Sequence, residues 1–197
     1  MDSKIQFSYS QNPAYFRLLG YLDALGRVFN SADYVCWFDA WLLHADGDQK
    51  LDGREMLRAV CPQTLPDDER WSELNQIEAR VAVERLLKLP IGDPAHEKHY
   101  PNHQVNNALA GLWERINDCF YFNSARHLSY EARGNEELHD YALEGFTLVS
   151  VAPDRKRTLI LHGGASGRAR SDKHVIPSPL MVAKALFPDD EDDQKSE

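Results

Sequence analysis

The sequence predicts a mainly helical domain that carries a small antiparallel β-hairpin. Apolar residues recur at steps of three and four through most of the first 120 residues, and this period is lost after Gly145. The length of 197 residues and a hydrophobic content of 43% suit one core in one domain. We expect five to six helices in a globular domain over residues 1–187, helical over 12–141, and an acidic, disordered tail over 188–197.

The start of the first helix is predicted from an N-cap signal in the sequence. Asn12-Pro13 combines an N-cap residue with proline in the first turn, and apolar side chains then follow at helical spacing as far as Phe29. A second helix is predicted from Ser31 to Leu43. It is apolar around so much of its circumference that we expect it to lie at the centre of the domain.

Three further helices are expected before residue 121. A short one begins near Gly53, and a Thr64-x-x-Asp67 cap signal opens a longer one that passes through Trp71 and closes before Pro90. After a polar loop over 90–103, apolar spacing from Val105 to Phe120 predicts another helix.

The C-terminal part is expected to begin with a β-hairpin over 145–162. Its β-prone runs, 146–151 and 157–161, flank a turn, and the alternating segment 5–9 is a candidate third strand. A basic, glycine-rich loop over 162–177 follows, and Ser178-Pro179 caps a last short helix over 178–187.

The charge is acidic and unevenly distributed. The chain has 31 acidic and 22 basic residues, a net charge of −9, which discourages non-specific binding to nucleic acid or membranes. Residues 189–197 carry −5, whereas residues 154–174 carry +4. The three cysteines suit a reducing compartment, and neither a signal peptide nor a long apolar segment is apparent, so a cytoplasmic location without membrane contact is expected.

The segment 44–55 resembles an EF-hand calcium loop. This resemblance implies calcium ligands from four carboxylates, because a hard cation prefers oxygen. His44 and Gln49 depart from the pattern at the first ligand and at the turn glycine. The alternative is an acidic turn between helices whose carboxylates cap the next helix. The candidate ligands are Asp46, Asp48, Asp52 and Glu55.

A second candidate metal site is a group of histidines, which are common zinc ligands. His96, His99 and His103 lie within eight positions. Pro101 prevents one continuous helix through all three, so exposed loop histidines are the alternative.

The segment 133–141 resembles the Arg-x(4–6)-His signature of HEPN-type ribonucleases, which are helical bundles that cleave RNA. The resemblance implies that His139 acts as acid and base on a ribose hydroxyl, that Arg133 stabilises the developing charge, and that Tyr141 accompanies them. An ordinary surface helix with an exposed histidine is the alternative.

A basic, glycine-rich segment is the candidate anion-binding or nucleic-acid-binding site, because backbone amides of such loops can form an anion-binding nest. A flexible connector is the alternative. The residues concerned are Arg155, Lys156, Arg157, Gly163, Gly164, Arg168 and Arg170.

Taken together, these patterns favour a non-enzymatic, acidic protein-binding or regulatory protein of the inhibitor or immunity type. Its acidic helical face is expected to dock on a basic surface of a protein partner. No cofactor is expected, with calcium or zinc as the alternatives. Two alternative functions remain: an RNA-directed HEPN-like ribonuclease or RNA-binding protein that uses Arg133, His139 and the 154–174 segment, and an adaptor modulated by a metal at the EF-hand-like loop.

Overall fold

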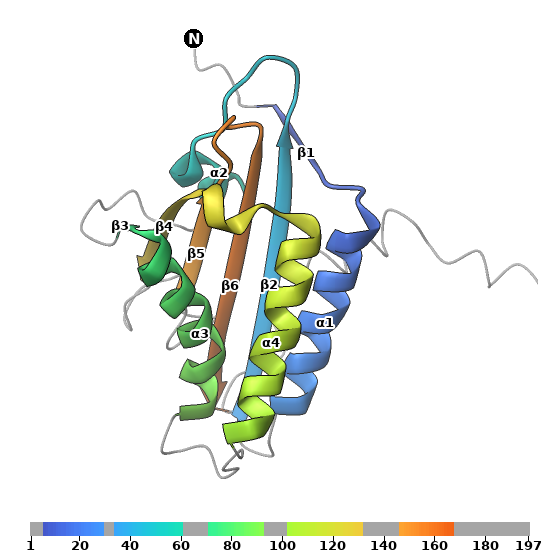
Figure 1. Cartoon of the computed structure of the whole chain (residues 1–197), viewed down its shortest axis with the longest axis vertical. Helices are drawn as coiled ribbons and strands as arrows, with labels where there is room; N and C mark the ends of the chain where they lie inside the picture. The colour runs from blue at the N-terminus through green and yellow to red at the C-terminus, as the bar shows by residue number, and fades with distance from the viewer. Residues whose placement is uncertain (1–5, 30–33, 61–70, 93–101, 132–145, 168–197) are drawn as a thin grey trace, which may run out of the picture.

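The structure, a computed structural model, describes residues 6–29, 34–60, 71–92, 102–131 and 146–167 (Figure 1). These residues form a six-stranded sheet with four α-helices and a short 3-10 helix. The strands are β1 (Phe7–Tyr9), β2 (Tyr34–Ala45), β3 (Trp71–Leu74), β4 (Arg126–Glu131), β5 (Phe146–Val151) and β6 (Arg157–Gly167). The helices are α1 (Pro13–Phe29), α2 (Gly53–Val60), α3 (Gln76–Gly92) and α4 (Asn102–Cys119), and the 3-10 helix is η2 (Phe122–Ser124).

The sheet is antiparallel throughout, with strand order β1-β2-β6-β5-β4-β3. Its longest ladder joins β2 to β6, from the pair Tyr34 and Gly167 to the pair His44 and Arg157. β2 and β6 lie more than 100 residues apart in the chain, so the centre of the sheet depends on distant contacts.

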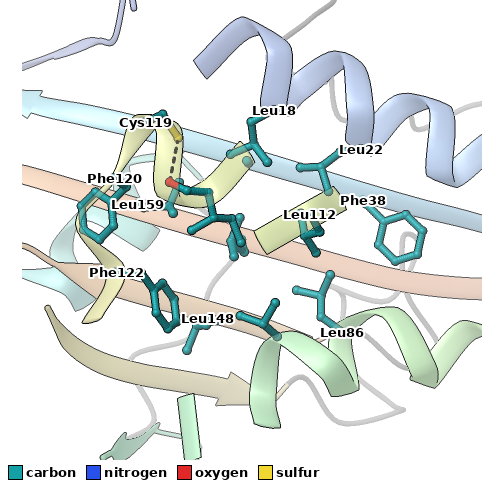
Figure 2. Packing of buried hydrophobic residues seen from close by; sticks show 14 of the residues in the cluster. Leu18, Leu22, Phe38, Leu86, Leu112, Cys119, Phe120, Phe122, Leu148 and Leu159 are labelled. Atoms are coloured by element: carbon teal, nitrogen blue, oxygen red, sulfur yellow. Dashed lines mark hydrogen bonds between the residues drawn. The ribbon is translucent and has the colours of Figure 1, made fainter. Parts of the chain in front are cut away.

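Three helices, α1, α3 and α4, pack on one face of the sheet (Figure 1). Figure 2 shows the core between them, where leucines of α1, α3 and α4 meet Leu148 of β5 and Leu159 of β6. Phe122 of η2 is fully buried there and makes an edge-to-face contact with Trp113. Burial of this apolar surface supplies the main force that holds the helices on the sheet.

The opposite face is covered by α2 over a second apolar cluster. Met56 and Leu57 of α2 pack there with residues of β2, β4, β5 and β6. Both faces of the central strands are therefore buried, which requires apolar residues at consecutive positions rather than strict alternation.

This two-sided burial explains why the helix predicted over 31–43 is wrong. Residues 34–43 of this segment belong to β2, whose Phe38 and Leu42 face the α1–α3–α4 side while Trp41 and Leu43 face α2. A short apolar run is compatible with a buried helix or a strand buried on both faces. The aromatic residues of this run favour the strand.

The long helix predicted from the Thr64-x-x-Asp67 signal is also wrong in its first part. Residues 71–74 are β3, and helix α3 begins only at Gln76. Asn75 is the cap: its Oδ1 accepts hydrogen bonds from the backbone N–H groups of Ile77 and Glu78 at 2.9 and 3.0 Å. Glu78 accepts one from the Asn75 N–H in return, at 2.8 Å, which completes a capping box. Thr64 and Asp67 lie outside the described residues.

The predicted β-hairpin is present but is only part of the sheet. β6 continues to Gly167, so residues 162–167 of the expected glycine-rich loop are strand. β4 falls within the segment expected to be helical and is not predicted from the sequence. The segment 5–9 contributes β1, which pairs with β2 and not with the hairpin.

The fold class predicted from the sequence, mainly α with a small hairpin, is therefore wrong, because a large antiparallel sheet forms the centre of an α+β fold. The helices predicted at 12–29, near 53 and over 105–120 are present as α1, α2 and α4. The short helix expected over 178–187 and the tail over 188–197 lie outside the described residues. None of the described helices is long and apolar enough to cross a membrane.

Candidate functional site

The predicted calcium loop lies against the turn between β5 and β6, and basic side chains of that turn contact its carbonyl groups. Arg155 Nε donates to the Leu51 carbonyl at 3.0 Å, and the Leu51 N–H donates to the Arg155 carbonyl at 2.8 Å. Lys156 Nζ donates to the Gly47 carbonyl at 2.7 Å. Arg155 has φ +56°, a conformation unfavourable for a non-glycine residue, and these reciprocal contacts hold it there.

Two of the four candidate calcium ligands accept hydrogen bonds from different parts of the fold. Asp46 accepts a hydrogen bond from the Ser8 hydroxyl, and Asp52 accepts from the N–H groups of Arg54 and Glu55 at the start of α2. Asp52 is thus the N-cap of α2, as the alternative interpretation of this segment proposed, although the preceding element is a strand. Among the described residues, no group of three His, Cys, Asp or Glu side chains converges as a metal site would require.

Replacing Asp52 with alanine is expected to lower the free energy of unfolding by about 1 kcal/mol, the usual contribution of an N-cap. The loss should be the same in calcium and in EDTA when measured by urea denaturation. Asp48→Ala is the matched control and should change stability by less than about 0.5 kcal/mol. A loss for Asp52→Ala that grows severalfold in calcium would indicate a metal ligand instead.

The basic, glycine-rich candidate site is divided by the fold. Gly163 and Gly164 are buried inside β6, where their backbones belong to the sheet ladder. Arg157 at the start of β6 lies over the exposed ring of Tyr121, with its guanidinium carbon 5.3 Å from the ring centroid. Arg155 and Lys156 hold the loop described above. Arg168 and Arg170 lie outside the described residues.

The HEPN-like residues Arg133, His139 and Tyr141 also lie outside the described residues, as do His96 and His99 of the histidine group. His103 is described and lies exposed in the first turn of α4. Neither prediction is tested by the geometry.

Two histidines on the sheet, one buried and one half-buried, are not predicted from the sequence as strand residues. His127 of β4 is 2% exposed, and its Nδ1 lies 2.9 Å from the Ser150 hydroxyl of β5. His162 of β6 lies on the opposite face, with its Nδ1 2.8 Å from the Thr147 hydroxyl of the same strand β5. Burial lowers the pKa of each imidazole to about 4, so both are neutral at physiological pH.

His162 belongs to a transverse row of side chains on the α2 side of the sheet. The strand register aligns one residue from each of five strands, so that neighbours in the row face each other across a ladder. Burial, with a smaller contribution from the Asp23 carboxylate, raises the pKa of the Asp39 carboxyl at one end of the row to about 6. The row consists of Asp39, His162, Thr147, Tyr130 and Trp71.

The described cysteines are not activated nucleophiles. Burial raises the pKa of the Cys36 thiol to about 12 and that of Cys119 to about 11. Thiols of this kind stay protonated at neutral pH and react slowly. Both side chains pack in the core, and Cys119 Sγ lies 3.5 Å from the Ile116 carbonyl (Figure 2).

Charge is separated between the described fold and the rest of the chain. The described residues include 13 acidic and 13 basic side chains, so the entire net charge of −9 belongs to the remaining sequence. The four helices contain six acidic and eight basic residues. The four helices together therefore carry no excess of acidic residues.

The described residues form a layered α+β fold: an antiparallel sheet with three helices on one face and one helix on the other. The solved structure of citrus MAF1 is similar to it, with a TM-score of 0.54 and 10% sequence identity over 81% of this chain and 100% of that chain. A second crystal form of citrus MAF1 gives a TM-score of 0.50 at 9% identity, covering 75% of this chain and 98% of that chain. At this identity the similarity shows a shared fold alone.

No protein-family model matches the sequence, and no curated protein matches it.

Proposed function

We propose that this protein is a non-enzymatic, acidic protein-binding protein of the regulatory or inhibitor type, which engages a basic surface of a protein partner. The observation that supports this proposal best is the distribution of charge. The described residues have no net charge, and the net charge of −9 belongs to the other residues of the chain. A described fold without net charge in a chain whose residues 189–197 carry −5 suits electrostatic recognition, since opposite charge speeds encounter and selects the partner.

The chemistry of the histidine and cysteine side chains within the described fold supports a binding role. General bases work best when their pKa lies near the working pH, and His127 and His162 have pKa values near 4. The Cys36 and Cys119 thiols have raised pKa values, the opposite of what a nucleophile needs. We place the protein in the cytoplasm, where buried thiols such as these stay reduced.

The RNA-directed alternative receives less support. Its basic segment includes Arg155 and Lys156, whose side chains already donate to carbonyl groups of the 46–52 loop. Arg157 stacks on Tyr121. Side chains engaged in this way are poorly placed to neutralise phosphates, which a nucleic-acid-binding surface requires.

The test is a quantitative capture experiment from extracts of the native cell. The bait is the full chain, compared with a variant in which the six acids of residues 189–197 are changed to Asn or Gln. A matched control changes six exposed acids of the described fold in the same way: Asp46, Asp48, Glu55, Glu73, Glu78 and Glu114. We expect a basic protein that binds the wild type and the control and is depleted at least about fivefold with the tail variant.

Two outcomes would contradict the proposal. One is an identical set of captured proteins for the wild type and the tail variant. The other is capture that disappears after ribonuclease treatment, which would favour the RNA-directed alternative.

A further inference from the structure

The chain has two Asp-Gly steps, Asp46-Gly47 and Asp52-Gly53, at the two ends of the loop between β2 and α2. Among aspartyl residues, one followed by glycine is the most prone to isomerise, because glycine has no side chain to hinder attack of its backbone nitrogen on the preceding carboxyl group. The attack also requires freedom of that carboxyl group and of the backbone around it. The structure gives the two steps opposite environments.

The Asp46-Gly47 step is exposed and weakly held. Both residues are exposed, and a Cβ atom added at Gly47 would have no neighbour within 4 Å. Gly47 has φ +60°, a conformation that glycine adopts without strain. The Asp46 carboxylate accepts a hydrogen bond at 3.2 Å from the hydroxyl of Ser8, which is exposed too, and such a bond exchanges readily with water. The Asp46 carboxyl group can therefore turn toward the Gly47 nitrogen.

The Asp52-Gly53 step is held in place by the start of α2. Asp52 is the N-cap, and its Oδ1 accepts from the Arg54 N–H at 3.0 Å. Gly53 is buried: a Cβ atom added there would lie 3.0 Å from Leu128 Cδ1 and 3.0 Å from Val149 Cγ1. Attack of the Gly53 nitrogen on the Asp52 carboxyl group would require the cap to break and the first turn of α2 to open.

We propose that Asp46-Gly47 is a site of spontaneous aspartate isomerisation in the folded protein and that the fold protects Asp52-Gly53. The Gly47 nitrogen attacks the side-chain carboxyl carbon of Asp46. A C–N bond forms, a C–O bond breaks, and the nitrogen's proton leaves with the hydroxyl as water. A second water molecule opens the resulting succinimide. Opening at the side-chain carbonyl restores aspartate, and opening at the main-chain carbonyl gives isoaspartate, which has the same mass.

The product would change how the loop is held. The isoaspartyl link lengthens the main chain by one methylene group and leaves the former main-chain carbonyl as a free carboxylate. Two contacts flank this link: the Asp46 N–H donates to the Gln6 carbonyl at 3.1 Å, and Lys156 Nζ donates to the Gly47 carbonyl at 2.7 Å. The modification therefore falls where the loop is attached to the rest of the fold. The proposal does not depend on the acidic segments on which the proposed function rests.

The test is prolonged incubation of the full chain at neutral pH and physiological temperature, followed by digestion with trypsin. Cleavage after Lys50 and Arg54 places the two steps on separate peptides, 28–50 and 51–54. Reversed-phase chromatography with mass spectrometry separates the isoaspartyl and aspartyl forms of each peptide. We expect isoaspartate to form at least about tenfold faster in 28–50 than in 51–54, because reaction at Asp52 requires opening of a helix cap.

The same incubation in denaturing guanidinium chloride is the control for local sequence. The two steps should then react at rates within about threefold of each other, because the unfolded chain lacks the cap and the burial of Gly53. Asp46→Glu is the chemical control: it keeps the charge, but its carboxyl group would have to close a larger ring. The isoaspartyl form of 28–50 should disappear in this variant, which also distinguishes Asp46 from Asp33 and Asp39 of the same peptide.

Two results would overturn the proposal. One is equal rates of isomerisation at the two steps in the folded protein. The other is a folded protein that stays unmodified in 28–50 while the denatured chain reacts there.

Discussion

Gly163→Val is expected to lower the free energy of unfolding by about 3 kcal/mol, the upper part of the range for overpacking a core. A Cβ atom at Gly163 would lie 2.8 Å from Leu86 Cδ2 and 3.0 Å from Phe38 Cδ1. The strand cannot move away, because β6 is paired with β2 on one side and β5 on the other. The added side chain would therefore separate α3 from the sheet.

Urea denaturation monitored by circular dichroism measures this loss. Gly20→Ala is the control: Gly20 is exposed in α1, and a Cβ atom added there would have no neighbour within 4 Å, so alanine should stabilise the helix by about 0.5–1 kcal/mol. If Gly163→Val were as stable as the wild type, residue 163 would belong to an exposed loop, and the packing of α3 over β6 would be wrong.

Acid is expected to destabilise the protein between pH 6 and about pH 4.5. A histidine in the unfolded chain binds its proton near pH 6.5, whereas His127 and His162 in the folded protein do so only near pH 4. Their contribution to the free energy of unfolding is therefore complete above pH 6.5 and is lost as the pH falls toward 4. Burial also lowers the pKa of His44, which acts in the same direction.

Asp39 opposes this effect. Its carboxyl has a pKa of about 6 when folded, against an ordinary value of 3.8, so the folded state takes up a proton first and gains stability as the pH falls from 6 to 4. In this pH range the unfolded chain binds two more protons at the histidines, and the folded protein binds one more at Asp39. The free energy of unfolding should therefore fall by about 1.4 kcal/mol for each unit that the pH is lowered.

The slope is measured by urea denaturation at several pH values. Asp39→Asn should roughly double it and should stabilise the protein at pH 7, because the asparagine is never charged. His127→Gln should reduce it toward zero. A wild-type slope near zero, unchanged in both variants, would show that these side chains are solvated in the folded protein.

The sequence predicts elements well where a local signal determines them. Asn12-Pro13 marks the start of α1, and the Asn12 carboxamide caps it by accepting from the Ala14 N–H at 2.9 Å. The interpretation of Asp52 as a cap for the next helix also agrees with the structure. The Asn75-x-x-Glu78 capping box is present in the sequence, but the similar signal at Thr64 competes with it and places the predicted start of α3 too early.

The sheet is harder to predict because its register depends on residues far apart in the chain. The β2 segment is apolar at consecutive positions, which is compatible with a central helix or with a strand buried on both faces. Its aromatic residues favour the strand, and the pairing with β6 establishes it. The histidine after Leu161 suggests the start of a polar loop until that pairing is known. The places of His127 and His162 in the sheet, and the row that ends at Asp39 and Trp71, follow from register, so local patterns could not reveal them.

The most direct test of the binding role is the ionic-strength dependence of affinity for the protein that the full chain captures. The dissociation constant should be measured by titration calorimetry at salt concentrations from about 50 to about 300 mM for the wild type, the tail variant and the matched control. Electrostatic recognition through the acidic segments predicts that affinity falls steeply with salt for the wild type and the control, and that the tail variant binds weakly with little salt dependence. Equal affinity and equal salt dependence for all three proteins would contradict it.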